Sequence, residues 1–339
     1  MERALLYKMY FQDNELFKKY YYVNAGEFAH LLTIYKSPDK LPGYTGKKSI
    51  IINAANDPWG LEWIKDIAIA CKPYGVVSAI LINDKKFADE NQALNFRFFP
   101  IWGYRYSQQI QEYADRDFFS NTRSTRVSCL NRIPKLHRAY TYYLLKQLPW
   151  YSDIFLSFYG LKSGDRLTSN PVEVTMSQIE SKLGSRVANF FASEIRNFPI
   201  TQESNYQWTI CHSANTPAYT DCYSNICTES SYERFCPTEK TFKCIATGTL
   251  IFPVSCVNFI SSMANMELDI SYTGMDLSAI DSVVKWRERT RLTIDLLDKL
   301  YYNIEDIWQS NKEQLRHNQQ ILQSKQLEKN ILKNIQDHL

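Results

Sequence analysis

The 339-residue chain lacks several features that would assign it to a special class of protein. It has no continuous apolar run of the ~18 residues that a membrane-spanning helix needs, so we expect no membrane span. Its first ten residues carry charges and no sustained apolar core, so we expect no secretory signal and a cytoplasmic location. The formal net charge of only +3 argues against a general nucleic-acid or membrane-surface binder.

Two common site motifs are also missing. No Gly-x-Gly-x-x-Gly fingerprint of dinucleotide-binding domains follows a predicted strand, and none of the eight cysteines forms a Cys-x-x-Cys pair of the kind found in zinc ribbons. Six cysteines fall between residues 211 and 256. Without a secretory signal we expect these cysteines to be reduced. They should be mostly buried and pack as small hydrophobic side chains rather than form disulfides.

The chain does show alternating strand and helix patterns. Residues 48–53 and 75–83 are apolar, strand-like runs, and residues 61–71 between them have helical periodicity. Similar alternation returns after a polar stretch at residues 120–125. The sequence therefore predicts an α/β protein with two Rossmann-like domains facing a cleft. The predicted parts are an N-terminal domain (1–122), a second domain (123–285) and a C-terminal helical segment (286–339).

The stretch from Tyr223 to Pro253 is the most informative part of the chain. It predicts a strand, a polar loop containing Glu229, a helix that ends at Gly248, and a second strand. Thr238 can cap this helix, and Glu239 and Lys240 fall in its first turn, where unpaired N–H groups attract anions. A carboxylate for ribose hydroxyls beside an ammonium for phosphate oxygens suits a nucleoside-diphosphate site. A solvated first turn would give the same residues.

A second basic motif lies about a hundred residues upstream. Residues 126–131 predict a strand, and a polar turn with Pro134 leads into a helix. Arg138 lies at the start of that helix, near Arg132, Lys135 and His137. A planar guanidinium can bind two phosphate oxygens at once, which suits a diphosphate, although a basic surface turn would look similar.

Together these motifs resemble the donor site of the alpha-1,3-fucosyltransferases and of fucosyltransferase-like, exostosin-like glycosyltransferases. The family pattern has Asn-x-x-x-Glu-Asn-Ser, then Thr-Glu-Lys, a helix and a glycine, and a helix-start arginine upstream. Thr228 stands where the family has an aromatic residue, and no Asn separates Glu229 from Ser230. The matching residues are Asn225, Glu229, Ser230, Thr238, Glu239, Lys240, Gly248 and, upstream, Arg138.

The resemblance implies the GT-B architecture and transfer of a sugar from a nucleotide sugar, with a GDP-fucose-like donor possible. It implies that Arg138 and Lys240 neutralise the departing diphosphate without a metal ion or other cofactor, while Asn225, Glu229, Thr238 and Glu239 complete the donor site. The family takes its catalytic base from a loop after an early strand, where Asp57 is the acid available here. The acceptor, whether glycan, lipid-linked or protein, stays open.

The C-terminal segment from Trp286 has apolar residues at helical spacing. It could be a docking helix, an oligomerisation helix or a frayed tail. Because a C-terminal helix of GT-B proteins commonly crosses back to the first domain, we expect docking there for the residues before Ser310.

Two alternatives to a GT-B transferase remain. Asp115 and Asp117 form an Asp-x-Asp sequence that a metal-dependent GT-A glycosyltransferase would use for a divalent cation, although a solvated helix end is the plainer interpretation. The chain could also be a non-enzymatic interaction protein on a degenerate glycosyltransferase fold, acting through its charged C-terminal helix.

Overall fold

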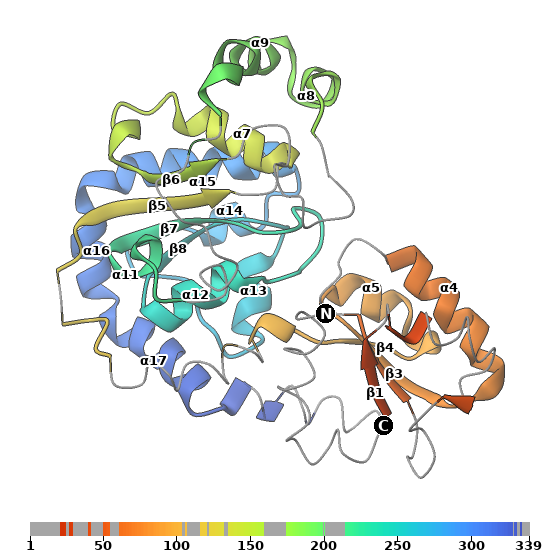
Figure 1. Ribbon diagram of the computed structural model, residues 1–339. Coiled ribbons are helices and arrows are strands. Elements are labelled where there is room, and N and C mark those ends of the chain that lie inside the picture. Colours follow the sequence, from red (N-terminus) through yellow and green to blue (C-terminus); the bar gives the residue numbers. More distant parts are fainter. Residues whose placement is uncertain are drawn as a thin grey trace. The chain divides into compact units, whose positions relative to one another are not determined.

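The computed structural model shows a mixed α/β protein whose two sheets are entirely parallel (Figure 1). The chain divides into two compact units, described separately below. The first comprises residues 1–113, 234–238 and 322–339, and the second comprises residues 114–233 and 239–321. The structure describes residues 21–24, 27–29, 40–41, 50–54, 61–103, 106, 116–120, 122–131, 135–158, 174–198, 200, 214–327, 329–330 and 333.

The first unit contains a four-stranded sheet in the order β1-β2-β3-β4. Its strands are β1 (Tyr21–Asn24), β2 (Ile50–Asn53), β3 (Val77–Ile82) and β4 (Phe96–Phe98). Helix α4 (Leu61–Cys71) follows β2, and helix α5 (Lys85–Glu90) follows β3. The apolar faces of these elements form one core, which confirms the predicted strand–helix–strand run of residues 48–83.

Part of the polar loop from the informative stretch belongs to this first unit. Asn83, just after β3, donates from its side-chain amide to the carbonyl of Pro237 at 3.0 Å. Asp84 caps α5 by accepting from the N–H of Phe87 at 2.9 Å, and it pairs with Arg234 at 3.3 Å. Residues 234–238 are therefore held by the polar groups that follow β3.

The second unit contains a four-stranded sheet in the order β6-β5-β7-β8. Its strands are β5 (Thr125–Asn131), β6 (Phe155–Phe158), β7 (Cys222–Thr228) and β8 (Leu250–Val254). Every residue of β7 and β8 is buried, as expected for parallel strands covered on both faces. The chain adds β6 on one side of β5 and then β7 and β8 on the other, so the strand order reverses between β5 and β7.

Helices cover both faces of this sheet (Figure 1). Helix α7 (Leu136–Leu145) packs with α15 (Trp286–Leu300) on one face, and α11 (Pro217–Thr220) packs with α12 (Glu239–Thr247) on the other. Right-handed crossovers explain this arrangement, because β5–α7–β6 and β7–α12–β8 progress across the sheet in opposite directions. The remaining helices of this unit are α8 (Met176–Leu183), α9 (Ser185–Glu194), α13 (Phe259–Ala264), α14 (Ser278–Asp281), α16 (Ile304–Ser310) and α17 (Lys312–Gln323), whose last two residues belong to the first unit.

The C-terminal helices complete the second unit rather than forming a separate segment. Helix α15 packs against β8 and α16 packs against β7. The residues from Trp286 to Ser310 therefore belong to the second unit, and their docking on the first domain stays a prediction. The reason is apolar burial: Ile294 and Leu297 of α15 and Trp308 of α16 lie in the core of the second unit.

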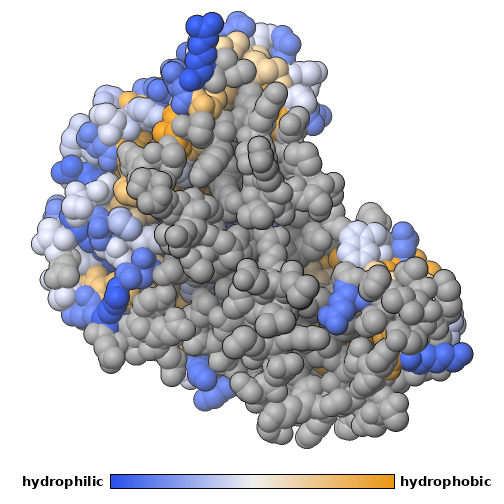
Figure 2. Space-filling view, viewed as in Figure 1, coloured by the Kyte–Doolittle hydropathy of each residue, from blue (hydrophilic) through white to orange (hydrophobic). Residues whose placement is uncertain are grey.

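The surface and the cysteines have the properties that the sequence predicts. On the face shown in Figure 2, hydrophilic residues cover much of the coloured surface, with small apolar patches between them. No helix in the described part of the chain has both the length and the hydrophobicity to cross a membrane. Burial and free thiols are confirmed for the seven described cysteines, namely Cys71, Cys129, Cys222, Cys227, Cys236, Cys244 and Cys256.

A buried arginine organises the amino edge of the second sheet. Arg123, only 5% exposed, precedes β5 and donates to the carbonyls of Cys222 (2.5 Å), Thr247 (2.5 Å) and Gly248 (3.1 Å). Its guanidinium also lies 4.9 Å from the ring centroid of Trp308, whose indole N–H donates to Gly248 at 2.7 Å. Burial lowers the pKa of Arg123 to about 10, which still leaves it charged at neutral pH.

Gly248 allows this arrangement. It has a left-handed backbone (φ +63°) just after α12, the conformation predicted for a helix-ending glycine. A Cβ atom at this position would collide with the ring of Phe119. Glycine is therefore required both by the backbone and by the packing beside Arg123.

Replacing Arg123 by Met should destabilise the protein by at least ~3 kcal/mol. The buried carbonyls of Cys222 and Thr247 would lose the donor that Arg123 supplies, and each buried group left unpaired costs ~1–3 kcal/mol. Urea-induced unfolding measures the change. Arg291→Met is the matched control, because Arg291 makes only an exposed pair with Asp295 (2.8 Å) and should change stability by less than ~0.5 kcal/mol. Equal effects of the two substitutions would contradict the role of Arg123.

Candidate functional site

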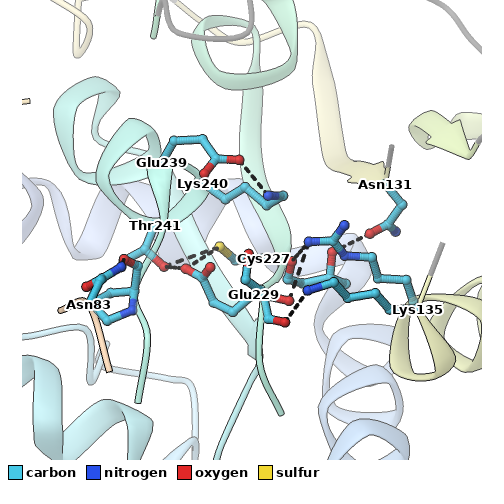
Figure 3. Close-up of polar contacts among 12 residues, drawn as sticks. Asn83, Asn131, Lys135, Cys227, Glu229, Glu239, Lys240 and Thr241 are labelled. Atoms are coloured by element: carbon cyan, nitrogen blue, oxygen red, sulfur yellow. Dashed lines mark hydrogen bonds and ion pairs between the residues drawn. The ribbon is translucent and has the colours of Figure 1, made fainter. Parts of the chain in front are cut away.

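The best-defined polar cluster lies where the strand order of the second sheet reverses. In open parallel sheets, ligands bind outside the carboxyl ends of the two strands that flank such a reversal. Here those strands are β5 and β7, which end at Asn131 and Thr228. The Thr228 hydroxyl donates to the Asn131 side-chain oxygen, joining the two strand ends directly (Figure 3). The topology therefore places the candidate site at this edge.

Helix α7 brings three basic side chains to the site. Arg138 is buried, and its Nη2 lies 3.3 Å from the Thr228 carbonyl and 3.5 Å from the Glu229 carbonyl. Lys135, at the N-cap position, donates its ammonium to the Ser230 carbonyl (Figure 3). Burial lowers the pKa of Arg138, whereas the nearby carboxylates of Glu239 and Glu229 raise it. The cationic groups thus converge on the residues that follow β7.

His137 is the third of these side chains and is neutral. Burial holds its pKa well below the usual range, and the charges of Arg138 and Lys135 lower it further. Its Nε2 lies 2.8 Å from the Glu229 carbonyl, so Nε2 carries the proton and donates it. Nδ1 is then an acceptor, and it is buried without a hydrogen-bond partner. His137 therefore fixes the loop after β7 without adding charge.

Glu229 supports the site from inside rather than facing solvent. Its side chain is 0% exposed, and Oε1 accepts from the Thr241 hydroxyl on α12 at 2.5 Å. Its backbone N–H donates to the Val254 carbonyl at the end of β8, at 3.1 Å. The carboxylate predicted for donor binding thus ties the β7 loop to α12 (Figure 3).

The start of α12 carries an ion pair. Helix α12 begins at Glu239, so Thr238 occupies the predicted cap position. The Lys240 ammonium lies 2.7 Å from the Glu239 carboxylate, and both side chains are partly buried. Burial opposes ionisation of Glu239, but Lys240 and Lys243 hold the pKa of its carboxyl at about 2. Glu239 is therefore ionised at neutral pH, in the first turn of the helix.

Asn225 lies away from this edge. It is 1% exposed within β7, and its amide donates to the Ser128 hydroxyl of β5 at 2.7 Å. Its side-chain oxygen has no hydrogen-bond partner. The contact joins two neighbouring strands in the sheet interior, where the side chain supports strand pairing. The pattern Asn-x-x-x-Glu could not reveal this, because strand burial depends on the whole sheet.

Arg289 of α15 is a site residue that the sequence analysis missed. Its buried guanidinium donates to the carbonyls of Ser255 (2.9 and 2.6 Å), Tyr232 (2.9 Å) and Val283. It therefore joins the end of β8 to the loop after β7. An arginine within a charged helix start gives no sign of this role in the sequence, since its partners are backbone carbonyls distant along the chain.

The helix that follows β8 is already capped by the protein. Asp281 accepts from the backbone N–H groups of Ile260 (2.9 Å) and Ser261 (3.1 Å) at the start of α13. An external anion would have to displace this carboxylate. Of the helices that follow β5, β7 and β8, α7 and α12 carry basic side chains in their first turns, whereas α13 carries none.

Arg289→Lys should loosen the loop after β7. One ammonium cannot reproduce the planar guanidinium, which reaches the carbonyls of four residues. We expect faster amide hydrogen exchange in residues 229–233 and 283–285, with α12 much less affected. Arg287→Lys is the matched control, because Arg287 bonds to the carbonyls of Lys182 (3.3 Å) and Leu183 (3.5 Å) and should affect the end of α8 instead. Unchanged amide hydrogen exchange in residues 229–233 of Arg289→Lys would contradict the role of Arg289 in holding the loop after β7.

Several predicted residues fall elsewhere. Asp57 and Asp115 lie outside the described residues. Asp117 is exposed, precedes β5, and accepts from the N–H of Phe119 at 2.8 Å. Within the described ranges, no group of three or more His, Cys, Asp or Glu residues could hold a metal ion.

Comparison with known proteins does not extend this description. The sequence matches no protein-family model and no curated protein.

Proposed function

We propose that the chain is a glycosyltransferase that uses a nucleotide sugar and binds its diphosphate at the carboxyl edge of the second sheet. The observation that carries the proposal is the position of Arg138 and Lys240. They lie at the starts of the helices that follow β5 and β7, on either side of the strand-order reversal. Parallel sheets bind nucleotides at such a reversal, and helix starts with basic side chains favour phosphate.

Charge and rigidity support this choice of ligand. Arg138, Lys135 and Lys240 bring three positive charges, against the carboxylates of Glu229 and Glu239. Glu229 is turned inward to Thr241, so Glu239 is the acid left near the helix start for ribose hydroxyls. The bonds of Lys135, His137 and Arg138 to the loop after β7 fix the positive groups before a ligand arrives. Such preorganised positive charge would stabilise the diphosphate as it leaves.

The remaining elements of the proposal come from the family resemblance. They are a GT-B arrangement of two Rossmann-like domains, transfer without a metal ion, and a GDP-fucose-like donor. In this scheme Asp57 removes the proton from the acceptor hydroxyl. The two parallel α/β sheets are compatible with this arrangement.

Lys240→Met should weaken binding of GDP or UDP by ~1.5–3 kcal/mol, the range for a hydrogen bond to a charged group, or roughly 10- to 150-fold. Methionine keeps the length of the side chain and removes the charge. Isothermal titration calorimetry measures the affinity, and Lys299→Met on the exposed end of α15 is the matched control.

Arg138→Lys should also weaken binding, because it keeps the charge but loses the fork. Thermal unfolding of each variant separates lost binding from lost fold. Affinity unchanged in both Lys240→Met and Arg138→Lys would refute the proposed site. Absence of any nucleotide binding by the native protein would favour an interaction protein instead.

Asp57→Asn should reduce sugar transfer by ~100-fold or more while nucleotide affinity stays the same. Asparagine keeps the size and polarity of the side chain but cannot take a proton, and general bases typically contribute this much. Transfer is measured as nucleoside diphosphate released in the presence of acceptor. Full transfer activity in Asp57→Asn would assign the proton transfer to another group.

A further inference from the structure

A polar depression of about 840 Å³ lies at the amino edge of the second sheet, within the second unit. Ser124 and Asp221 immediately precede β5 and β7, whereas the candidate site follows the same two strands. The depression therefore lies at the opposite edge of the sheet from the candidate site. Its described lining consists of Arg116, Asp117, Phe118, Ser120, Thr122, Ser124, Asn215, Thr220 and Asp221.

The buried Arg123 explains why this surface is open and ordered. Residues 122–124 alternate between exposed and buried, so Arg123 points into the core while Thr122 and Ser124 point outward. Thr125 donates its backbone N–H to the Asp221 carbonyl at 3.0 Å, which fixes the two strand starts together. The exposed hydroxyls of Thr122 and Ser124 thus flank the buried Arg123.

The polar side chains around the depression are linked to one another. The Arg116 guanidinium donates to the Asn215 side-chain oxygen at 2.5 Å, joining two segments distant along the chain. The Thr220 hydroxyl donates to the Asp221 carboxylate at 2.7 Å. These contacts orient a guanidinium, an amide and a carboxylate, which are planar groups that can each meet two neighbouring hydroxyls.

The charge of the lining selects the class of ligand. One guanidinium faces two carboxylates, those of Asp117 and Asp221, so the described lining is net negative. Phosphates, sulfated glycans and nucleic acids are therefore disfavoured. Four hydroxyls and one aromatic ring, Phe118, line the depression, and its surface is more polar than apolar, which disfavours a lipid. A neutral ligand rich in hydroxyl groups satisfies all of these groups.

We propose that this depression binds a neutral carbohydrate, separately from the candidate active site. Its volume is within the range of about 300–1,000 Å³ of small-ligand sites. The lining offers both donors and acceptors, which suit sugar hydroxyls that donate and accept, and Phe118 offers an aromatic ring for the apolar side of a pyranose. The inference does not depend on transferase activity, because it uses only the amino edge of the sheet.

Saturation-transfer NMR on the full-length protein tests the proposal with maltotriose, cellotriose and chitotriose as probes. At least one trisaccharide should give a signal that falls at least fivefold in Ser124→Trp, where the indole fills the depression, and in Arg116→Ala. Ser181→Trp, on the exposed face of α8, is the matched control and should leave the signal unchanged. Thermal unfolding confirms that each variant is folded.

The outcomes separate this site from the carboxyl edge. Lys240→Met should leave trisaccharide binding unchanged, and Ser124→Trp should leave GDP or UDP binding unchanged. The proposal is overturned if no trisaccharide binds, or if Ser124→Trp and Arg116→Ala retain the signal. It is also overturned if Lys240→Met abolishes the signal, because the sugar would then occupy the carboxyl edge.

Discussion

The buried guanidinium of Arg123 is the interaction on which the arrangement of the second unit depends. Its guanidinium is surrounded by backbone carbonyls at the end of α12 and beside the starts of β5 and β7, with Trp308 against it. The partners are dipoles rather than a carboxylate, so the charge is solvated by the fold itself. The C-terminal end of a helix also carries partial negative charge, which favours a cation there. Arg123 thereby holds the end of α12 against the starts of β5 and β7.

The contacts of Arg123 at the amino edge of the sheet help to position the charged side chains at its carboxyl edge. The end of α12 is fixed by Arg123 and Gly248, so its start presents Glu239 and Lys240 beside the loop that follows β7. His137 and Arg138 hold that loop from α7, and Arg289 holds it from α15. Buried hydrogen bonds from α7 and α15 thus hold the loop beside the positively charged groups. Such rigidity is what a site needs if it is to stabilise a leaving diphosphate without reorganising.

Much of this fold could be predicted from the sequence, because local patterns determine its elements. Apolar runs predicted β5, β7 and β8, and the threonine and glycine at the ends of α12 predicted its bounds. The roles of Asn225, Glu229 and Arg289 could not be predicted. Each is decided by partners from another element: Ser128 for Asn225, Thr241 for Glu229, and backbone carbonyls for Arg289. A motif shows which groups are present, whereas burial and strand pairing decide where they point.

The central claim is that the carboxyl edge of the second sheet binds a nucleoside diphosphate. Thermal unfolding of the native protein with GDP and with UDP, each compared with its nucleoside, tests it most directly. A ligand that binds the folded state raises its apparent stability in proportion to RT ln(1 + [L]/Kd). The account predicts that at least one diphosphate raises Tm by about 2 °C or more at millimolar concentration, while guanosine and uridine do not. Equal shifts with nucleosides and diphosphates, or no shift with any nucleotide, would contradict it.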